Sequence, residues 1–470
     1  MGRNESFPEI RQVYEHAGQE LASLVGQNIS PGIEHRHSTL SSHVLSTILA
    51  HTALGRTSEK THHWIEQHAR GMDTMGIQTQ ISGSSSLMFA CFEILEDICG
   101  VPLPVQLREK MPSIDEIEKQ LDYSCSYDDC YTLPLHLACA ALLCTIKGEK
   151  MPQIPRIVAD LQQEDGSWTD DTTITALAAI ALREEGIEPR YDAQEWLKRE
   201  QLPDGSWAAA NGEVWEASYA LRTGETSMRL QLLETLKGCL HPNCWWGFSR
   251  YAVPDVDDTA VACCALEPFE PHLTSAVCKN LLAVQHENGG WGAFPHITGV
   301  VPHESVVGKA RTSNNDVTCH VLEAFEVNKV FTSGFKRGIS YLLENQEKDG
   351  HWSTTWWNSD IYATVEIALL LNRNGYEEPA LRSAGWLEKK LEGTLNIVEC
   401  TLLMKAFSEI EDFAECQEKA VHRFLEQYHL NCFDPVFDGV HFVGLIDYRI
   451  YRMALIVSSL GSLFRCGWKQ

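Results

Sequence analysis

Three carboxylates fall within four consecutive positions near the middle of the chain. Asp255, Asp257 and Asp258 stand just ahead of an apolar segment that begins at Val261 and ends at Leu266. If a helix begins here, its backbone N–H groups and its dipole favour negative charge at this end. The plain alternative is an acidic N-cap, because aspartate is common at helix starts.

Burial of this acidic stretch would change its chemistry. Like charges a few ångströms apart do not all ionise cheaply, so one proton is retained. Asp257 stands between its two acidic neighbours and is the expected holder of that proton. A carboxylic acid that keeps its proton acts as a general acid, and it needs a partner that stabilises its conjugate base. We therefore expect proton donation from Asp257, supported by Asp255 and Asp258.

A seven-residue phrase of the form Gln-x-x-Asp/Asn-Gly-x-Trp is repeated after residue 150. Its copies are Gln162–Trp168, Gln201–Trp207, Gln285–Trp291 and Gln346–Trp352. Each copy lies between segments with the apolar periodicity of helices, and glycine beside Asp or Asn ends a helix and forms a turn. Repeated helix–turn–helix units without alternating strand patterns predict an all-α fold, a solenoid or toroid of helix pairs.

The repeated phrase, the motif Asp255-Val256-Asp257-Asp258-Thr259-Ala260 and the segment from Asp316 to Glu323 together resemble the class II terpene cyclases. The resemblance is to squalene-hopene cyclases and bacterial class II diterpene cyclases, and it extends to the segment from Ile446 to Arg452. It implies an α/α-toroid of the β-type, which carries the acid motif, at residues 150–470. Residues 1–149 are then expected to form an N-terminal helical region, or a reduced version of the second, γ-type domain.

The resemblance also implies roles for single residues. Asp257 matches the middle acid, which protonates the terminal alkene or epoxide of a linear polyprenyl chain and so starts its cyclisation. His320 resembles the histidine that hydrogen-bonds this acid, and a cationic imidazole there would stabilise the carboxylate left behind. The plain alternative is a helix histidine bonded to a backbone carbonyl. Thr318 stands where many class II diterpene cyclases have Asn, which favours the squalene-hopene type.

The implied reaction creates a carbocation, so its cavity must be dry and free of nucleophiles. Aromatic faces stabilise a passing cation by up to about 2 kcal/mol per desolvated contact. Aromatic residues near the motifs are therefore candidates for substrate binding, although packing in the core is an equally good reading of each one. These candidates are Trp245, Trp246, Phe248, Trp356, Trp357, Tyr362, Phe442 and Tyr448.

The head group of the substrate is a separate question. A diphosphate needs cationic groups or Mg²⁺ at the pocket mouth, and Arg250, Lys309 and Arg311 are the candidates, with solvated surface charge as the alternative. The carboxylate motif that binds Mg²⁺ in the γ-type domain of diphosphate-using relatives is not evident, and the nearest substitute is the set Glu93, Glu96 and Asp97. We therefore expect no metal ligands and no cofactor, and a prenylated C15–C20 substrate without phosphate. The alternative is geranylgeranyl diphosphate, which would bring Mg²⁺ with it.

Charge and apolar patterning exclude several partners. The formal net charge is -26, from 38 Lys and Arg against 64 Asp and Glu, and no basic block tracks a phosphate backbone, so nucleic acid is not expected. The N-terminus lacks the apolar core of a signal peptide, and no apolar run is long enough to span a bilayer. We expect a cytoplasmic protein with a hydrophobic isoprenoid substrate. Peripheral membrane contact and the oligomeric state stay open.

Two other readings of a helical toroid stay open at this point. A protein prenyltransferase β-type subunit would need a zinc site built from Asp, Cys and His. A non-catalytic toroid used as a binding module would keep the acidic stretch only as a helix cap, and it predicts that Asp257 is solvated.

Overall fold

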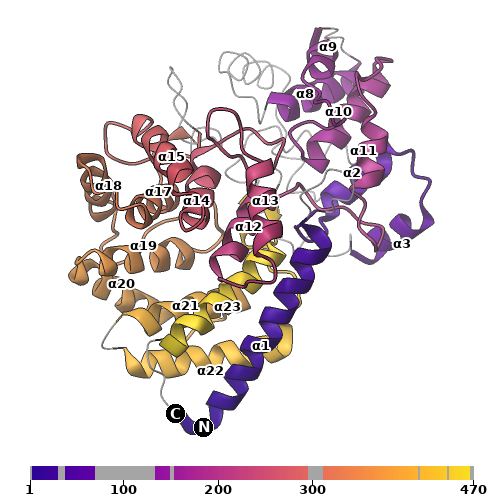
Figure 1. Ribbon diagram of the computed structural model, residues 1–470. Helices are drawn as coiled ribbons and strands as arrows, with labels where there is room; N and C mark the ends of the chain where they lie inside the picture. Colours follow the sequence, from indigo (N-terminus) through magenta and orange to yellow (C-terminus); the bar gives the residue numbers. More distant parts are fainter. Residues whose placement is uncertain are drawn as a thin grey trace.

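The computed structural model describes residues 3–29, 38–68, 133–148, 153–294, 311–410, 413–441 and 444–465 (Figure 1). The helices are α1 (Arg3–Asn28), α2 (Val44–Ala53), α3 (Glu59–His68), α8 (Leu133–Lys147), α9 (Gln153–Asp160), α10 (Thr172–Glu184), α11 (Ala193–Arg199), α12 (Glu213–Arg222), α13 (Arg229–Gly238), α14 (Val256–Leu266), α15 (Pro271–Ala283), α17 (Asn315–Val327), α18 (Ser333–Glu344), α19 (Ile361–Arg373), α20 (Glu377–Lys390), α21 (Ile397–Glu409), α22 (Ala414–Asn431) and α23 (Arg449–Arg465). Between α22 and α23, the short antiparallel strands β1 (Gly439–His441) and β2 (Gly444–Ile446) form a hairpin.

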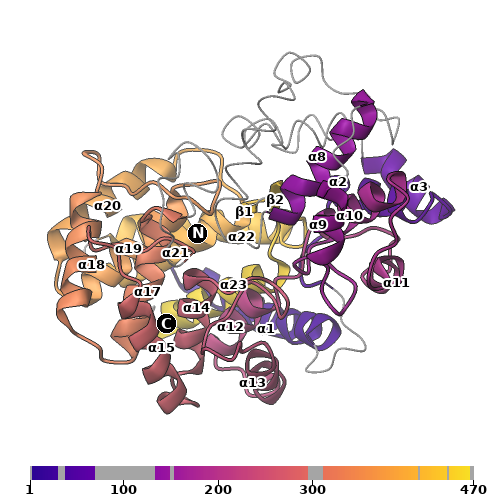
Figure 2. The ribbon, with the colours of Figure 1, turned by 90° about the horizontal axis from the view of Figure 1, so that it is seen from above.

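The larger part of the molecule is a closed ring of helix pairs. The inner helices α12, α14, α17, α19, α21 and α23 contact one another in this order, and α23 returns to α12. Helices α13, α15, α18, α20 and α22 each pack outside the inner helix that precedes them, and α1 packs outside α23 (Figures 1 and 2). The predicted all-α toroid is confirmed, and the N-terminal helix is part of it.

A second hydrophobic core lies among α2, α3 and α8 to α11, which are drawn at the right of Figure 1. Helices α2, α8 and α10 pack together there, with α3, α9 and α11 against them. Helices α9 to α11 follow residue 149, yet they share this core with α2, α3 and α8, which precede it. The predicted division of the chain at residues 149 and 150 therefore does not coincide with the grouping of core residues.

The repeated phrases directly follow the ends of α9, α11, α15 and α18. In every copy the tryptophan is buried, and its indole Nε1 donates to the carbonyl ten residues earlier, at 2.6 to 2.7 Å. The glutamine Nε2 donates to the carbonyl of the glycine in the same phrase. This glycine has a positive φ of 91 to 103° in the four copies, a backbone conformation that residues with side chains rarely adopt.

A further tryptophan has the same geometry without the phrase. The Trp246 Nε1 donates to the Leu236 carbonyl at 2.7 Å, again ten residues earlier, and its backbone N–H donates to the Thr259 hydroxyl at 2.9 Å. The Asp255 N–H donates back to the Trp246 carbonyl at 2.9 Å, forming a bridge between the two residues. Trp246 therefore fixes the start of α14, where the acidic motif lies.

Candidate active site

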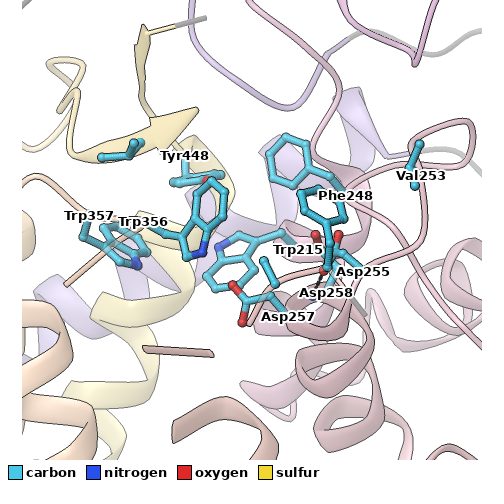
Figure 3. A pocket seen from close by; sticks show the side chains of 12 residues that line it. Trp215, Phe248, Val253, Asp255, Asp257, Asp258, Trp356, Trp357 and Tyr448 are labelled. Carbon is cyan, nitrogen blue, oxygen red and sulfur yellow. Dashed lines mark hydrogen bonds between the residues drawn. The ribbon is translucent and has the colours of Figure 1, made fainter. Parts of the chain in front are cut away.

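Asp255 and Asp258 form a pair at the beginning of α14. Asp255 is the N-cap, and its Oδ1 accepts a hydrogen bond from the Asp258 backbone N–H at 2.7 Å. Figure 3 shows both carboxyl groups together below Phe248, while the carboxyl group of Asp257 points away from them. The acidic N-cap expected as the plain alternative is thus real for Asp255, although all three acids are buried at the wall of a pocket.

Asp257 instead faces α17. Its Oδ1 lies 2.5 Å from the Nδ1 of His320, and the side chains of both residues are largely buried. On the other side of the imidazole, Nε2 lies 2.8 Å from the hydroxyl of Tyr362 on α19. The plain alternative for His320, a helix histidine bonded to a backbone carbonyl, is therefore not what the structure shows.

The environment of these groups shifts their acidity. Burial raises the pKa of Asp255 to about 7, against hydrogen bonds from Asp258. Burial, together with the charge of Asp255, raises the pKa of Asp258 well above its ordinary value. Burial lowers the pKa of His320, but the charge and hydrogen bond of Asp257 outweigh this effect and leave the pKa above its ordinary value. Burial and the contacts among these groups thus shift the pKa values of Asp255, Asp258 and His320 upwards. Proton retention on Asp257 stays a prediction.

The acids open into a pocket of about 590 Å³ with mainly apolar walls (Figure 3). Its lining residues are Trp215, Phe248, Val253, Asp255, Asp257, Asp258, Ala293, Phe294, Trp356, Trp357, Val440 and Tyr448. Four of the aromatic candidates from the sequence are among them, namely Phe248, Trp356, Trp357 and Tyr448. The arrangement can deliver a proton from Asp257 into a cavity with several aromatic faces.

Neighbouring segments hold these aromatic walls in place. The buried Asp316 carboxylate accepts from the backbone N–H groups of Thr355 and Trp356 at 2.9 and 2.8 Å, which fixes the loop ahead of α19. Gly439 of β1 lies against the Tyr448 ring so closely that a side chain there would overlap it. The hairpin can therefore approach the pocket and place Val440 in its wall.

Sequence reasoning missed Trp215, the largest of the unanticipated lining residues. Trp215 lies in the first turn of α12, and its ring is 5.5 Å from the His320 ring in an edge-on arrangement. It also lies 6.3 Å from the Trp357 ring. The signal for it was present, because α12 follows the repeat Gln201–Trp207 and its first turn corresponds to the place of Asp257 in α14. No pattern in the sequence indicated the other unanticipated lining residues, which are Val253, Ala293, Phe294 and Val440.

Three aromatic candidates lie outside the pocket lining. Trp246 is fully buried as the structural tryptophan described above, and Trp245 packs half-buried against the larger core. Tyr362 is buried behind His320, with its ring stacked on Trp357 at 4.0 Å. None of the three is among the described residues that line the pocket, and their part in substrate binding stays a prediction. Phe442 lies outside the described residues.

Neither Arg250 nor Arg311 is among the described residues that line the pocket. The Arg250 guanidinium donates to the Gly238 carbonyl at 2.8 Å at the outer side of the barrel. Arg311 is buried ahead of α17 and is not among the lining residues. Lys309 lies outside the described residues, as does the set Glu93, Glu96 and Asp97.

Thr318 has a structural role that its comparison with diterpene cyclases did not reveal. Its hydroxyl accepts from the backbone N–H of Trp291 at 3.0 Å. Thr259 makes the same contact with Trp246, and Thr364 makes it with Trp352. The threonine at this position therefore belongs to the helix-pair repeat, and its bearing on the substrate stays a prediction.

The described parts of the chain contain neither a membrane-spanning helix nor a ready-made metal site. No helix there is long and apolar enough to cross a membrane. No group of three or more His, Cys, Asp and Glu side chains in those parts is arranged to hold a metal ion.

Comparison with known proteins agrees with this geometry. Residues 234–393, which include the acid motif and His320, match the family model described as the squalene-hopene cyclase C-terminal domain. The squalene-hopene cyclase of Alicyclobacillus acidocaldarius is 28% identical over 238 residues, which are 45% of this chain and 33% of that protein. The enzyme of Schizosaccharomyces japonicus is 29% identical over 226 residues, 43% of this chain and 30% of that protein. The matches thus span about a third of the length of these curated relatives.

The structural similarity covers more of the chain. The ent-copalyl diphosphate synthase from Streptomyces platensis superimposes with a TM-score of 0.63 over 96% of this chain and 99% of that one, at 14% identity. At this identity the similarity concerns the fold alone. In sequence over the matched domain, and in fold over nearly the whole chain, the protein is thus similar to class II terpene cyclases.

Proposed function

We propose that this protein is a cyclase in which Asp257 protonates the terminal alkene, or an epoxide, of a linear polyprenyl chain. The resulting carbocation then closes rings along the folded substrate. One observation carries the proposal: the Asp257 carboxyl group lines an aromatic pocket and is backed at 2.5 Å by a buried histidine. An acid in contact with both a cavity and a basic partner is placed to give up a proton to a substrate.

The surrounding residues support each step of this reaction. A protonated His320 stabilises the Asp257 carboxylate that remains after transfer, because opposite charges attract strongly in a buried site. Trp215, Trp356 and Trp357 present aromatic groups to the cavity, and these suit a migrating cation. Apolar walls keep water from quenching the cation before the rings have formed.

For the substrate, we propose a prenylated C15–C20 chain whose head group carries no phosphate. Neither lysine nor arginine is among the described residues that line the pocket, and its charged groups there are the three acids. A diphosphate near these carboxylates would be repelled unless cations outside the described residues held it. On this proposal the protein needs no cofactor.

The alternative is a class II diterpene cyclase that converts geranylgeranyl diphosphate to a bicyclic copalyl-type diphosphate. The observation in its favour is the shared fold over nearly the whole chain with an ent-copalyl diphosphate synthase. This alternative would require Mg²⁺ or cationic side chains at the head group. A non-catalytic binding module is disfavoured, because it predicts a solvated Asp257, whereas this residue is only 9% exposed.

We further propose that the two cores correspond to the two domains of the family. Residues 213–465, with α1, would be the β-type barrel, and the core shared by α2, α3 and α8 to α11 would belong to the γ-type domain. The location of this unit ahead of the acid motif supports the assignment.

Mass spectrometry of products tests the proposed function. Purified protein is incubated with geranylgeranyl diphosphate, with and without Mg²⁺, and separately with a phenol that carries a geranylgeranyl chain. The Asp257→Asn variant, which keeps the size of the side chain, is the matched control. We expect a cyclic isomer of the prenylated phenol from the wild type alone. A cyclic diphosphate would support the alternative, and equal products from both proteins would refute an acid role for Asp257.

A further inference from the structure

The loop between α13 and α14 carries two residues of the pocket wall, Phe248 and Val253. In chain order this loop belongs to the larger barrel. Nevertheless, Ala252 is one of the buried residues of the second core, and Phe248 and Val253 pack against that core. Part of the pocket wall is therefore held from outside the barrel that contains the acid. This matters for the proposed function, because the contour of the cavity decides how a prenyl chain is folded when its rings close.

A buried aspartate just ahead of α10 reaches this loop. The Oδ2 of Asp170 accepts a hydrogen bond from the Ser249 hydroxyl at 2.6 Å, and its Oδ1 accepts one from the Asn211 side-chain amide at 2.8 Å. The side chains of Asp170 and Ser249 are both fully buried. Separation of the two would leave buried polar groups without a partner, which is unfavourable. The contact therefore ties the loop to the helices of the second core.

The backbone is bent at the residue that makes this contact. Thr169 and Asp170 have positive φ values of 56 and 57°, which are uncommon for residues other than glycine and rare for a β-branched residue. The Asp170 N–H donates to the Ser167 hydroxyl at 3.3 Å, and its carbonyl accepts from the Asn211 N–H at 3.2 Å. Backbone strain of this kind persists only where the surrounding contacts hold it, and it is common at functional sites.

Two further hydrogen bonds hold the same loop on either side of the serine. The Gln163 Nε2 donates to the Tyr251 carbonyl at 2.7 Å, from the first repeated phrase. The Val214 N–H, in the first turn of α12, donates to the Phe248 carbonyl at 3.2 Å. The serine that Asp170 holds directly follows Phe248 in the chain. The backbone of this lining residue is thus fixed on one side by the barrel and on the other by the second core.

We infer that Asp170 is a positioning residue that, through Ser249, sets the place of the Phe248 ring in the pocket wall and so selects which fold of the prenyl chain is cyclised. Asp170 is not among the described residues that line the pocket, and it does not contact the acid motif through any hydrogen bond described above. The inference rests on the proposed function for its effect on the products. Loss of the Asp170 contact should change the product mixture and leave proton donation by Asp257 nearly unchanged.

Two substitutions break the contact from either side. Ser249→Ala removes the hydroxyl donor, and Asp170→Asn keeps the size of the side chain but replaces one of its two acceptors by a donor. Ser383→Ala on α20 is the matched control. This serine is equally buried, and its hydroxyl bonds to the Pro379 carbonyl and the Gln346 side chain, neither of which lines the pocket. Thermal unfolding checks that all variants are folded.

The first measurement needs no substrate and therefore stands apart from the proposed function. Backbone hydrogen exchange is followed by mass spectrometry on peptides that cover residues 247–253. We expect Ser249→Ala and Asp170→Asn each to speed exchange in this loop by about fivefold or more, because a lost hydrogen bond favours local opening. Ser383→Ala should leave the exchange of this loop unchanged. Exchange at the wild-type rate in both Ser249→Ala and Asp170→Asn would overturn the inference, since the loop would then be held without Asp170.

The second measurement analyses products and rates with whichever of the two prenyl probes the wild type converts. We expect Ser249→Ala and Asp170→Asn to raise the share of minor products several-fold, with kcat within about threefold of the wild type, because the acid and His320 are untouched. Ser383→Ala should give the wild-type mixture. A fall in rate without any change in products would contradict a positioning role for Asp170.

The double variant Asp170→Asn/Ser249→Ala tests whether the aspartate acts through the serine. We expect its product mixture to match that of Ser249→Ala alone, because the contact is already lost in the single variant. Effects on the products that add in the double variant would contradict the route through Ser249. If the wild type converts neither probe, the proposed function fails, and the exchange measurement still decides whether Asp170 holds the loop.

Discussion

The Nδ1 atom of His320 lies 2.5 Å from Oδ1 of Asp257, although the two residues are 63 positions apart in the chain. They meet because α14 and α17 are neighbours in the inner ring. Both helices begin beside a buried tryptophan: α17 beside Trp291 of the repeated phrase, and α14 beside Trp246, which has the same geometry without the phrase. These tryptophans therefore fix where α14 and α17 begin, and so place Asp257 and His320 at the same level along the barrel axis.

Loss of His320 should impair proton transfer without unfolding the barrel. In His320→Gln the side chain stays polar but no longer carries a positive charge, so the carboxylate left on Asp257 loses its stabilising partner. We expect turnover of the accepted prenyl probe to fall by about 10²-fold or more, as is typical for general acid–base catalysis. Steady-state rates measured beside an unfolding curve check this, and a rate near that of the wild type would show that His320 is only a packing residue.

The two tryptophans Trp246 and Trp356 should behave differently when truncated. Trp246 is fully buried and bonded to Leu236, so Trp246→Ala should destabilise the fold by about 3 to 5 kcal/mol. Trp356 is only partly buried and lines the pocket, so Trp356→Ala should cost less stability and alter the products. Urea unfolding and product analysis at a temperature where both variants are folded separate the two effects. If only Trp246→Ala altered the products, Trp246 would be the residue that shapes the pocket, and the roles assigned to the two tryptophans would be wrong.

Replacement of Thr318 tests its structural role. In Thr318→Val the backbone N–H of Trp291 loses the hydroxyl that accepts its hydrogen bond. We expect a loss of about 1 to 3 kcal/mol in the free energy of unfolding, the usual effect of leaving a buried donor without a partner. The products should stay the same. A new product without loss of stability would mean that Thr318 influences the substrate after all.

Glu323 should make the protein sensitive to acid. Burial opposes ionisation of this carboxyl group, but Arg222, Arg373 and Lys405 outweigh that effect and lower its pKa from 4.5 to about 2. Its folded-state pKa is depressed, so its contribution is fully present above pH 4.5 and is lost as the pH falls towards 2. The shift corresponds to about 3 kcal/mol.

Urea unfolding at a series of pH values between 5 and 2.5 measures this contribution. The free energy of unfolding of the wild type should fall more steeply on acidification than that of Glu323→Gln, which cannot titrate. Parallel curves for the two proteins would show that the ion pairs of Glu323 do not stabilise the fold.

The architecture and the acid were predictable because their signals are local. Each Gln-x-x-Asp/Asn-Gly-x-Trp phrase is a complete turn between two helices, and its repetition predicts the stacked pairs. The cluster of Asp255, Asp257 and Asp258 is likewise contained in four positions. The resemblance then supplied His320, which no local pattern of its own marks out.

The remaining features depend on contacts between distant segments. Membership of α1 in the larger barrel follows from packing against α23, at the far end of the chain. Trp246 and Phe248 are both aromatic and two positions apart, yet one faces the core and the other the pocket. The direction in which the Asp257 side chain points, away from Asp255 and Asp258, is set by α17 and not by its own neighbours.

Transfer of a solvent-derived proton to the prenyl chain is the central claim, and deuterium incorporation measures it directly. The protein is equilibrated in D₂O and supplied with the accepted prenyl probe, and the cyclised product is analysed by mass spectrometry and NMR. We predict one non-exchangeable deuterium, located on the ring CH₂ carbon that was the CH carbon of the terminal alkene and lies next to the carbon bearing the two terminal methyl groups, and no cyclised product from Asp257→Asn. A cyclised product without deuterium at that carbon would mean that the reaction does not begin with proton donation, and it would contradict the role assigned to Asp257.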